Sequence, residues 1–373
     1  MAALVLQGHG SVERISELAV QLGMQHPMLV GGQRLSEVYK QRTGQACAVF
    51  SGYHPNPDFA DCVAGAAMYR DNGCDGLISI GGGSAMDTAK GIKAMLLAST
   101  AKDALVYHFS DERIPHIAIP ATAGTGAEAT QFAVVYLQGM KHSLSHPSLL
   151  PEGVVLDASL LDTLPVYHKK SCALDALCQG IESYWSVGAT EESRVHASAA
   201  IRGVLGRVRA YMAGGASAAA DMLEAAYRSG QAIQISRTTA AHAMSYRLTH
   251  HFGIAHGHAC MLTLPVLWDM MLQEEPLRPV LQELTAIMGL TDVAQGSQLL
   301  CGLMLELEMD APVLPGKDVL DDLTASVNAE RLGNHPQKMT QTMLRYVYVR
   351  ALTPMSKAQR EACRKVWAQY GQA

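Results

Sequence analysis

Short apolar segments alternate with helical patterns over the first 160 residues of this chain of 373 residues. Residues 59–73, for example, place apolar side chains at helical spacing and end in a glycine. The apolar segments between the helical patterns are typical of buried strands, and the first four of them end in glycine or a glycine loop; these segments are residues 26–32, 46–52, 74–84, 114–126 and 153–161. Alternating strands and helices predict a parallel sheet that is covered by helices.

The pattern changes after residues 163–165 (TLP). The remaining sequence is rich in Ala, Leu, Met, Glu and Gln, and apolar residues recur every three or four positions in 171–186, 192–213 and 220–246. We therefore predict an α/β N-terminal domain over residues 1–163 and an all-α C-terminal domain over residues 164–373.

Composition narrows the functional classes. Hydrophobic residues make up 49% of the chain and charged residues 17%, which is typical of a globular protein with a large core. The net charge of −5 and the lack of a basic run give no case for nucleic acid or for an anionic membrane surface. The sequence has no run of about 18 apolar residues and no signal-peptide pattern at its start. Its eight cysteines include no CxxC pair, so we expect free thiols and a cytoplasmic location.

A glycine loop follows the predicted strand of residues 74–84. Gly82, Gly83 and Ser84 stand directly before a helical pattern, where backbone N–H groups and the helix N-terminus favour a phosphate. We expect Ser84 to cap this helix and Asp87 to lie in its first turn. The loop lacks the usual G-x-G-x-x-G spacing, and a tight turn without a ligand is the alternative.

A second loop, PATAGTGAEAT at residues 120–130, also follows a predicted strand. It offers the hydroxyl groups of Thr122, Thr125 and Thr130, with glycines that let the backbone bend. Two loops of this kind at the same edge of a parallel sheet form a crevice for a dinucleotide. The second loop therefore favours nucleotide binding over two purely structural turns.

Candidate metal ligands lie in the helical half. Asp175 and Gln179 are four residues apart, so they share a helix face. His242 and Tyr246 repeat this spacing, and His256 follows in a stretch of nineteen residues, 242–260, that holds five histidines. One carboxylate and imidazoles from separate helices would suit a divalent metal that polarises a carbonyl oxygen. Taken singly, each residue has the alternative of a cap, a surface position or a hydrogen-bonded core position, and we assign the other three histidines mainly to such supporting roles.

Five segments in order resemble the motifs of the iron-containing, or group III, alcohol dehydrogenases, whose fold is shared with glycerol dehydrogenase and dehydroquinate synthase. The segments are GGGSAMDTAK, PATAGTGAEAT, VVLDASLLDTLP, DALCQGIESYWS and HAMSYRLTHHFGIAHGHACMLTLP. The resemblance covers nearly the whole chain. It implies an N-terminal dinucleotide-binding domain, a helical domain, an active site in the cleft between them, an NAD(P)-dependent alcohol dehydrogenase or aldehyde reductase activity, and a homodimer.

The resemblance also implies a metal set and departures from it. The family usually holds its metal with one Asp and three His; here the matching positions are Asp175, Gln179, His242 and His256. An amide oxygen is a weak ligand, so both the identity of the metal, Fe²⁺ or Zn²⁺, and its occupancy stay open. His242 and His256 are the expected catalytic ligands. Tyr246 stands where relatives often have a His that is proposed to relay protons, and it could donate the proton instead.

The cofactor-binding positions carry a further departure. Many relatives have an Asp after the second strand, where this chain has Gly32, so nothing repels a 2′-phosphate and Arg34 could pair with it. We favour NADPH, with NADH as the alternative and a solvated Arg34 as the other interpretation. Lys141 matches a lysine that lies beside the cofactor ribose in relatives.

The segments LDALCQGIESYWSV and SYRLTHHFGIAHGHA resemble a subgroup of this family, the phosphonoacetaldehyde reductases, which reduce phosphonoacetaldehyde to 2-hydroxyethylphosphonate. Gln179 and Tyr246 belong to this resemblance. A phosphonate needs cationic partners, and Arg247, His250 and Lys141 are the candidates for binding it. The alternatives are reduction of another small aldehyde such as sulfoacetaldehyde or an alkanal, a lyase or cyclase of the dehydroquinate synthase type, and a nucleotide-binding protein that has lost its metal.

Overall fold

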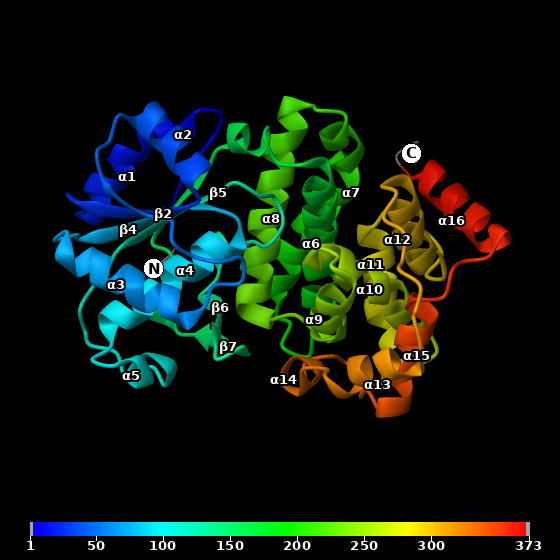
Figure 1. Cartoon of the computed structure of the whole chain (residues 1–373). Helices are drawn as coiled ribbons and strands as arrows, with labels where there is room; N and C mark the ends of the chain where they lie inside the picture. Colours follow the sequence, from blue (N-terminus) through cyan, green and yellow to red (C-terminus); the bar gives the residue numbers. More distant parts are fainter. Residues whose placement is uncertain (1–2, 371–373) are drawn as a thin grey trace. The chain divides into compact units, whose positions relative to one another are not determined.

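The chain folds into two compact units, each of which is described by itself. The first comprises the chain up to Leu164 together with Ala216–Gly230, and the second comprises Pro165–Gly215 and the chain from Gln231 onward. The computed structural model describes residues 3–370 (Figure 1). The predicted fold class, an α/β first half followed by a helical second half, is confirmed.

A six-stranded sheet forms the centre of the first unit, and all of its paired strands are parallel. The strand order is β1-β8-β5-β4-β2-β3. All six residues of the central strand β4 are buried, as the apolar run in the sequence predicts. The strands are β1 (Leu4–Gln7), β2 (Pro27–Gly31), β3 (Ala48–Phe50), β4 (Gly76–Gly81), β5 (His116–Pro120) and β8 (Gly153–Leu156).

Helices cover both faces of this sheet because successive side chains of a strand point to opposite faces. On β2, Met28 and Val30 belong to a core cluster with side chains of α3 and α4, whereas Leu29 belongs to a separate cluster with side chains of α1 and α2. The helices of this unit are α1 (Ile15–Leu22), α2 (Gln33–Thr43), α3 (Phe59–Asp71), α4 (Gly83–Leu97) and α5 (Ala101–Leu105).

An antiparallel hairpin, β6 (Phe132–Leu137) and β7 (Met140–Ser145), adds an element that the sequence analysis did not predict. Its two-residue turn has positive φ at both Gln138 (52°) and Gly139 (75°), as a type I′ hairpin turn requires. Ala133 and Val135 point into the core beside α3 and α4. The signal in the sequence was the residue–glycine turn of Gln138 and Gly139 between two short strand-like segments.

The segment Ala216–Gly230 groups with the first unit, whereas its sequence pattern places it in the helical half. It belongs to α8 (Ala216–Ser236). A Cβ atom added to Gly230 would lie 2.3 Å from the backbone oxygen of Gly126, so two glycines bring this helix against the loop that follows β5. Helical periodicity identifies the helix but carries no information about which neighbour it packs against.

The second unit is helical throughout its described residues. Helix α6 lies at its centre, and its residues Ser171 to Trp185 are almost all buried. No helix formed by residues 3–370 combines the length and the apolarity needed to cross a bilayer. Besides α8, the helices from residue 165 onward are α6 (Val166–Trp185), α7 (Glu191–Met212), α9 (Ala240–Phe252), α10 (His256–Leu272), α11 (Arg278–Ile287), α12 (Gln295–Glu306), α13 (Lys317–Ala325), α14 (Ala329–Leu332), α15 (Gln341–Ala351) and α16 (Lys357–Gln369).

Candidate functional site

The glycine loop between β4 and α4 lies beside the loop that follows β5. A Cβ atom on Gly82 would lie 3.2 Å from the side chain of Thr122, and one on Gly83 would lie 3.3 Å from that of Thr125. Glycine at both positions therefore lets the two predicted loops approach each other. No side chain caps the N-terminus of α4, so its first backbone N–H groups are available to an anion. This arrangement suits the predicted binding of a dinucleotide phosphate.

Two details predicted for the glycine loop are wrong. The N-cap of α4 is Gly82 rather than Ser84, and the Ser84 hydroxyl accepts a hydrogen bond from the backbone N–H of Asn56 (3.3 Å). Asp87 lies beyond the first turn of α4, which holds no acidic residue. The helix begins at Gly83, one residue before its first polar side chain, and its N-cap residue Gly82 is extended and has no side chain that could mark the start. Cofactor binding by Ser84 and Asp87 stays a prediction.

Thr130 belongs to a buried polar cluster under the second loop. The Lys90 ammonium group donates hydrogen bonds to Thr130 Oγ1 (3.2 Å) and to the carbonyl oxygens of Ala127 (2.7 Å) and Phe132 (2.8 Å). Beside them, burial raises the pKa of Glu128 to about 7. Thr130 thus helps to hold the loop in place, and its predicted contact with the cofactor stays a prediction.

The residues predicted to select the cofactor lie on α2 and β7. Gly32 is the N-cap of α2 in an extended conformation, and Arg34 follows in the first turn. The exposed Arg34 guanidinium donates a hydrogen bond to the hydroxyl of Thr163, so a cofactor phosphate would have to compete with that partner. Lys141 lies on β7 of the unpredicted hairpin and is half-buried. None of these contacts tests the expected preference for NADPH.

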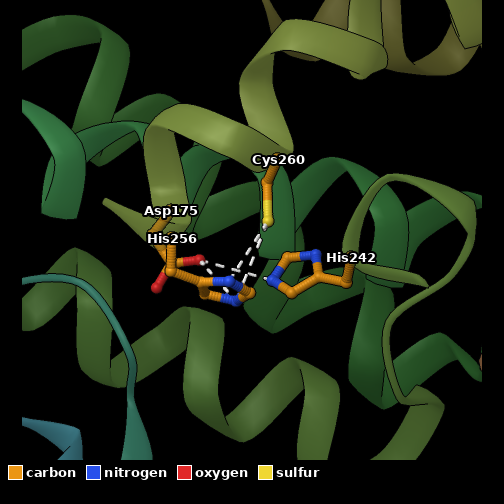
Figure 2. A group of neighbouring side chains, drawn as sticks. All are labelled: Asp175, His242, His256 and Cys260. Carbon is orange, nitrogen blue, oxygen red and sulfur yellow. Dashed lines mark hydrogen bonds and ion pairs between the residues drawn. The ribbon is translucent and has the colours of Figure 1, made fainter. Parts of the chain in front are cut away.

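Four side chains of the helical unit converge in a group that could hold a metal ion (Figure 2). Asp175 comes from α6, His242 from α9, and His256 and Cys260 from α10. One ligand atom from each residue lies within 4.8 Å of the others. The predicted convergence of Asp175, His242 and His256 therefore occurs, and Cys260 joins them. We call these four residues the metal-binding group.

The orphaned polar atoms of this group fit a cation. Asp175 Oδ1 and His242 Nε2 are buried and lie 3.3 Å apart, and within the described structure neither has a hydrogen-bond partner. His256 Nε2 lies 4.0 Å from the same carboxylate oxygen. Buried polar atoms normally have partners, and a divalent ion bound by a carboxylate, two imidazoles and a thiolate would satisfy them. This donor set matches the chemistry of Zn²⁺ and is compatible with Fe²⁺.

Gly257 makes the convergence possible because it brings the start of α10 against α6. A Cβ atom at this position would lie 2.0 Å from the carbonyl oxygen of Ser171 and 2.6 Å from the Cβ of Asp175. Glycine is thus required where the two helix backbones touch. The close approach places His256, the preceding residue, beside the carboxylate of Asp175.

Glu182 fixes the orientation of His242. Its Oε2 accepts a hydrogen bond from His242 Nδ1, which leaves Nε2 directed at the metal-binding group. Its Oε1 accepts bonds from the backbone N–H groups of Thr239 (3.0 Å) and Ala241 (2.9 Å) and from the Thr239 hydroxyl (2.7 Å). Burial raises the pKa of Glu182, but His242 and these hydrogen bonds lower the pKa by more than burial raises it. The carboxylate therefore stays ionised. The sequence analysis missed this residue.

Tyr246 and His256 form the accessible side of the metal-binding group. Their rings stack with centroids 5.9 Å apart and an angle of 9° between the planes. The side chain of His256 is 39% exposed, whereas those of Asp175 and His242 are almost fully buried. Ser245 Oγ lies 3.2 Å from His256 Nδ1 and holds the ring from the other edge. A substrate carbonyl would therefore approach past Tyr246 and His256.

Arg331 contributes charge to this region. Its guanidinium lies over the Tyr246 ring, 5.7 Å from the centroid. Burial raises the pKa of Asp175, but His242, His256 and Arg331 together lower it by more than burial raises it. The carboxylate is therefore ionised and available as a metal ligand. The sequence analysis missed Arg331, which lies 71 or more residues from every member of the metal-binding group.

Cys260 is the ligand candidate that the sequence analysis missed. It follows His256 by four residues on α10 and lies 3.8 Å from His256 Nε2, a spacing that places both on one helix face. Burial raises the pKa of this thiol, but His242 and His256 more than reverse the effect and bring the pKa to about 7. A thiol with this pKa is readily converted to the thiolate that binds metals. The His-x-x-x-Cys spacing was the signal in the sequence.

Gln179 lies one turn after Asp175 on α6 and is buried. The sequence analysis assigns it the place of a family His. With Cys260 in the group, four stronger donors are present without an amide oxygen. Metal ligation by Gln179 stays a prediction.

Substituting serine for Cys260 is expected to abolish the thiolate signature of the cobalt-loaded protein. Co²⁺ bound to a thiolate gives an intense near-ultraviolet charge-transfer band, which a hydroxyl ligand does not give. Absorption titration of the metal-free protein with Co²⁺ measures this band. Cys62→Ser, a buried cysteine of the first unit, should keep it; a wild-type protein that binds Co²⁺ without the band would contradict ligation by Cys260.

The remaining polar residues of the histidine-rich stretch have other partners. Arg247 Nη2 lies 3.4 Å from Asp322, and His251 Nε2 lies 2.7 Å from the same carboxylate. His250 is exposed. His258 is buried, with its Nδ1 3.3 Å from the Tyr167 hydroxyl. The predicted substrate contacts of Arg247 and His250 stay untested.

Comparison with known proteins identifies the family. The model of the iron-containing alcohol dehydrogenases matches residues 2–158, and the model of the C-terminal domain of the Fe-containing alcohol dehydrogenase family matches residues 170–344. The chain is 31% identical over 283 residues to the probable alcohol dehydrogenase EutG of Escherichia coli (strain K12), which is 71% of each protein. It is 37% identical over 227 residues to the phosphonoacetaldehyde reductase of Streptomyces viridochromogenes, which is 57% of each protein.

A solved structure extends the likeness to nearly the whole chain. The sulfoacetaldehyde reductase of Bifidobacterium kashiwanohense in complex with NAD⁺ superposes with a TM-score of 0.86 at 27% identity, over 93% of this chain and 97% of that one. The family models together match most of the chain. The chain therefore belongs to the iron-containing alcohol dehydrogenases, a family of oxidoreductases that use NAD(P) and a divalent metal.

Proposed function

We propose that this enzyme reduces a small anionic aldehyde with NAD(P)H, and that its substrate is phosphonoacetaldehyde, which becomes 2-hydroxyethylphosphonate. The 37% identity to the phosphonoacetaldehyde reductase of S. viridochromogenes supports this assignment. The observation that carries it is the metal-binding group together with the residues beside it. On its accessible side, the guanidinium of Arg331 lies over the phenol ring of Tyr246. Such a site offers partners for both ends of an anionic aldehyde.

The residues of the helical unit divide the work of carbonyl reduction. Asp175, His242, His256 and Cys260 would hold the divalent metal, which when bound supplies a Lewis acid for the carbonyl oxygen. Glu182 keeps the ring of His242 oriented as a ligand. These residues thus define where the aldehyde oxygen has to lie.

Tyr246 is the proposed proton donor. Its phenolic O–H would give a proton to the carbonyl oxygen of the aldehyde, directly or through water, while NAD(P)H, when bound, would supply the hydride. Stacking on His256 fixes the phenol ring beside the metal-binding group. Solvent then returns a proton to the phenolate before the next turnover.

The cofactor is proposed to bind at the two loops of the first unit. Gly82 and Gly83, the uncapped start of α4 and the neighbouring threonines suit a pyrophosphate. We favour NADPH because Gly32 puts no carboxylate at the start of α2 and Arg34 is exposed there. Homodimerisation and a cytoplasmic location stay predictions.

Substrate preference is expected to follow charge. Steady-state oxidation of NADPH and of NADH should be measured with phosphonoacetaldehyde, sulfoacetaldehyde and butyraldehyde at matched ionic strength. We expect kcat/KM for phosphonoacetaldehyde to exceed that for butyraldehyde roughly 10- to 100-fold, the value of one charge-assisted contact. Equal values for the two would overturn the proposal. A preference for sulfoacetaldehyde would instead support the second candidate, which the likeness to the B. kashiwanohense enzyme favours.

A further inference from the structure

The accessible side of the metal-binding group carries one unpaired cation. Arg331 has no carboxylate within ion-pair distance anywhere in residues 3–370, although its guanidinium donates a hydrogen bond to Thr238 Oγ1 (2.5 Å). Arg247 and His251 both share Asp322, and Arg237 is paired with Glu330 (2.7 Å). Among the described residues, Arg331 is therefore a cation without an ion-pair partner.

The contacts of Arg331 connect it to the metal-binding group through a single side chain. Its guanidinium lies 5.7 Å from the centroid of the Tyr246 ring, and that ring stacks on His256. His256 Nε2 in turn lies 4.0 Å from Asp175 Oδ1. One aromatic ring, that of Tyr246, therefore contacts both the cation and the imidazole of His256.

The backbone around Arg331 is fixed to the element that carries two site residues. Asn334 Nδ2 donates hydrogen bonds to the carbonyl oxygens of Ser236 (2.7 Å) and Thr238 (3.1 Å), in the turn that leads into α9. Helix α9 holds His242 and Tyr246. The position of Arg331 is thereby set relative to the metal-binding group, as a residue that selects substrates requires.

We propose that Arg331 binds the anionic group of the substrate and sets the preference for anionic aldehydes. This inference rests on the proposed function. A guanidinium presents five N–H donors in a planar fork that matches two oxygens of a phosphonate or sulfonate. Thr238 uses part of this fork and orients the remainder. In a 2-oxoethyl phosphonate or sulfonate, one methylene separates the acidic group from the carbonyl carbon, so the anion-binding residue has to lie close to the metal ligands.

The proposal differs from the sequence-based choice of Arg247. That residue lies one position from Tyr246, but successive residues of a helix point in different directions. Its guanidinium is 3.4 Å from Asp322 of α13, so an anionic substrate would have to displace a carboxylate to reach it. Arg331 requires no such exchange.

The experiment compares Arg331→Gln, Arg331→Lys and Arg247→Gln with the wild-type enzyme. The measured quantity is the ratio of kcat/KM for phosphonoacetaldehyde to kcat/KM for butyraldehyde, because a general loss of folding or metal lowers both values and cancels in the ratio. We expect Arg331→Gln to lower this ratio roughly 10- to 100-fold through a higher KM for the anionic aldehyde, with Arg331→Lys in between because it keeps the charge without the fork. Arg247→Gln should change the ratio less than about threefold, less than the loss of one charge-assisted bond.

The outcomes separate this inference from the proposed function. A wild-type ratio near one would overturn the proposed function itself. A high wild-type ratio that survives in Arg331→Gln would overturn the role of Arg331 alone, and its loss in Arg247→Gln would assign the anion to Arg247. Inhibition by 2-hydroxyethylphosphonate, measured with butyraldehyde as substrate, gives a second readout: Arg331→Gln should raise its inhibition constant by a similar factor, and an unchanged constant would contradict the proposal.

Discussion

Replacing Asp175 with alanine is expected to remove the metal from the enzyme and to abolish aldehyde reduction. Asp175 supplies the only carboxylate of the metal-binding group, and its Oδ1 lies against the ligand nitrogens of both histidines. Loss of residues that merely support a metal ligand costs 10- to 100-fold in affinity or activity, so loss of the anionic ligand itself should cost at least about 100-fold in both. Neutral imidazoles and one thiolate would remain.

Two measurements check this expectation. Competition with a chromophoric chelator gives the affinity for Zn²⁺ or Co²⁺ without any reference to turnover, and kcat/KM for the aldehyde gives activity. Asp269→Ala, which removes an exposed carboxylate farther along α10, serves as the control and should keep its metal. An Asp175→Ala enzyme that retained both the metal and turnover would show that the metal lies elsewhere or is not used.

Alanine at Gly257 is expected to be the most damaging single-methyl substitution in the helical unit. The added Cβ would overlap the carbonyl oxygen of Ser171 at 2.0 Å and the backbone nitrogen of Asp175 at 2.7 Å. Both atoms belong to the backbone of α6, so relief requires α10 to move away. We expect a loss of about 3 kcal/mol or more in the free energy of unfolding, above the usual range for overpacking because no side chain can rotate aside.

The same movement should weaken metal binding, since it carries His256 and Cys260 away from Asp175. Thermal unfolding and chelator competition measure the two effects. Gly206→Ala is the control, because Gly206 lies within α7 with no atom within 4 Å of the added methyl group; it should be neutral or stabilising by up to about 1 kcal/mol. Wild-type stability and metal affinity in Gly257→Ala would contradict the contact between α10 and α6.

Periodicity was sufficient to predict the parallel sheet, because the strands β2, β3 and β4 are each followed by glycine and then by a helix pattern. It was not sufficient for the hairpin of β6 and β7, whose alternation is short and lies directly after a loop already assigned to ligand binding. The start of α4 was misplaced because the N-cap position holds Gly82, which has no polar side chain to signal the start of the helix.

Only part of the candidate site was predicted, because some of its residues stand in a recognisable sequence pattern and others do not. Asp175, His242 and His256 stand in spaced patterns that converge in the structure. Cys260 has the same four-residue spacing from His256, but a search for paired cysteines passes over a single thiol. Arg331 has no local signal, because only the packing of α14 against α9 brings it to the site.

The hydrogen bond between His242 and Glu182 orders the imidazole of His242 before any metal ion binds. The carboxylate that aligns the imidazole also receives the first free N–H groups of α9. The ring is consequently immobilised as the helix begins, by the same event that orders the backbone. The conformational entropy of this ligand is lost during folding, so an arriving ion meets a preorganised donor and keeps more of its binding free energy.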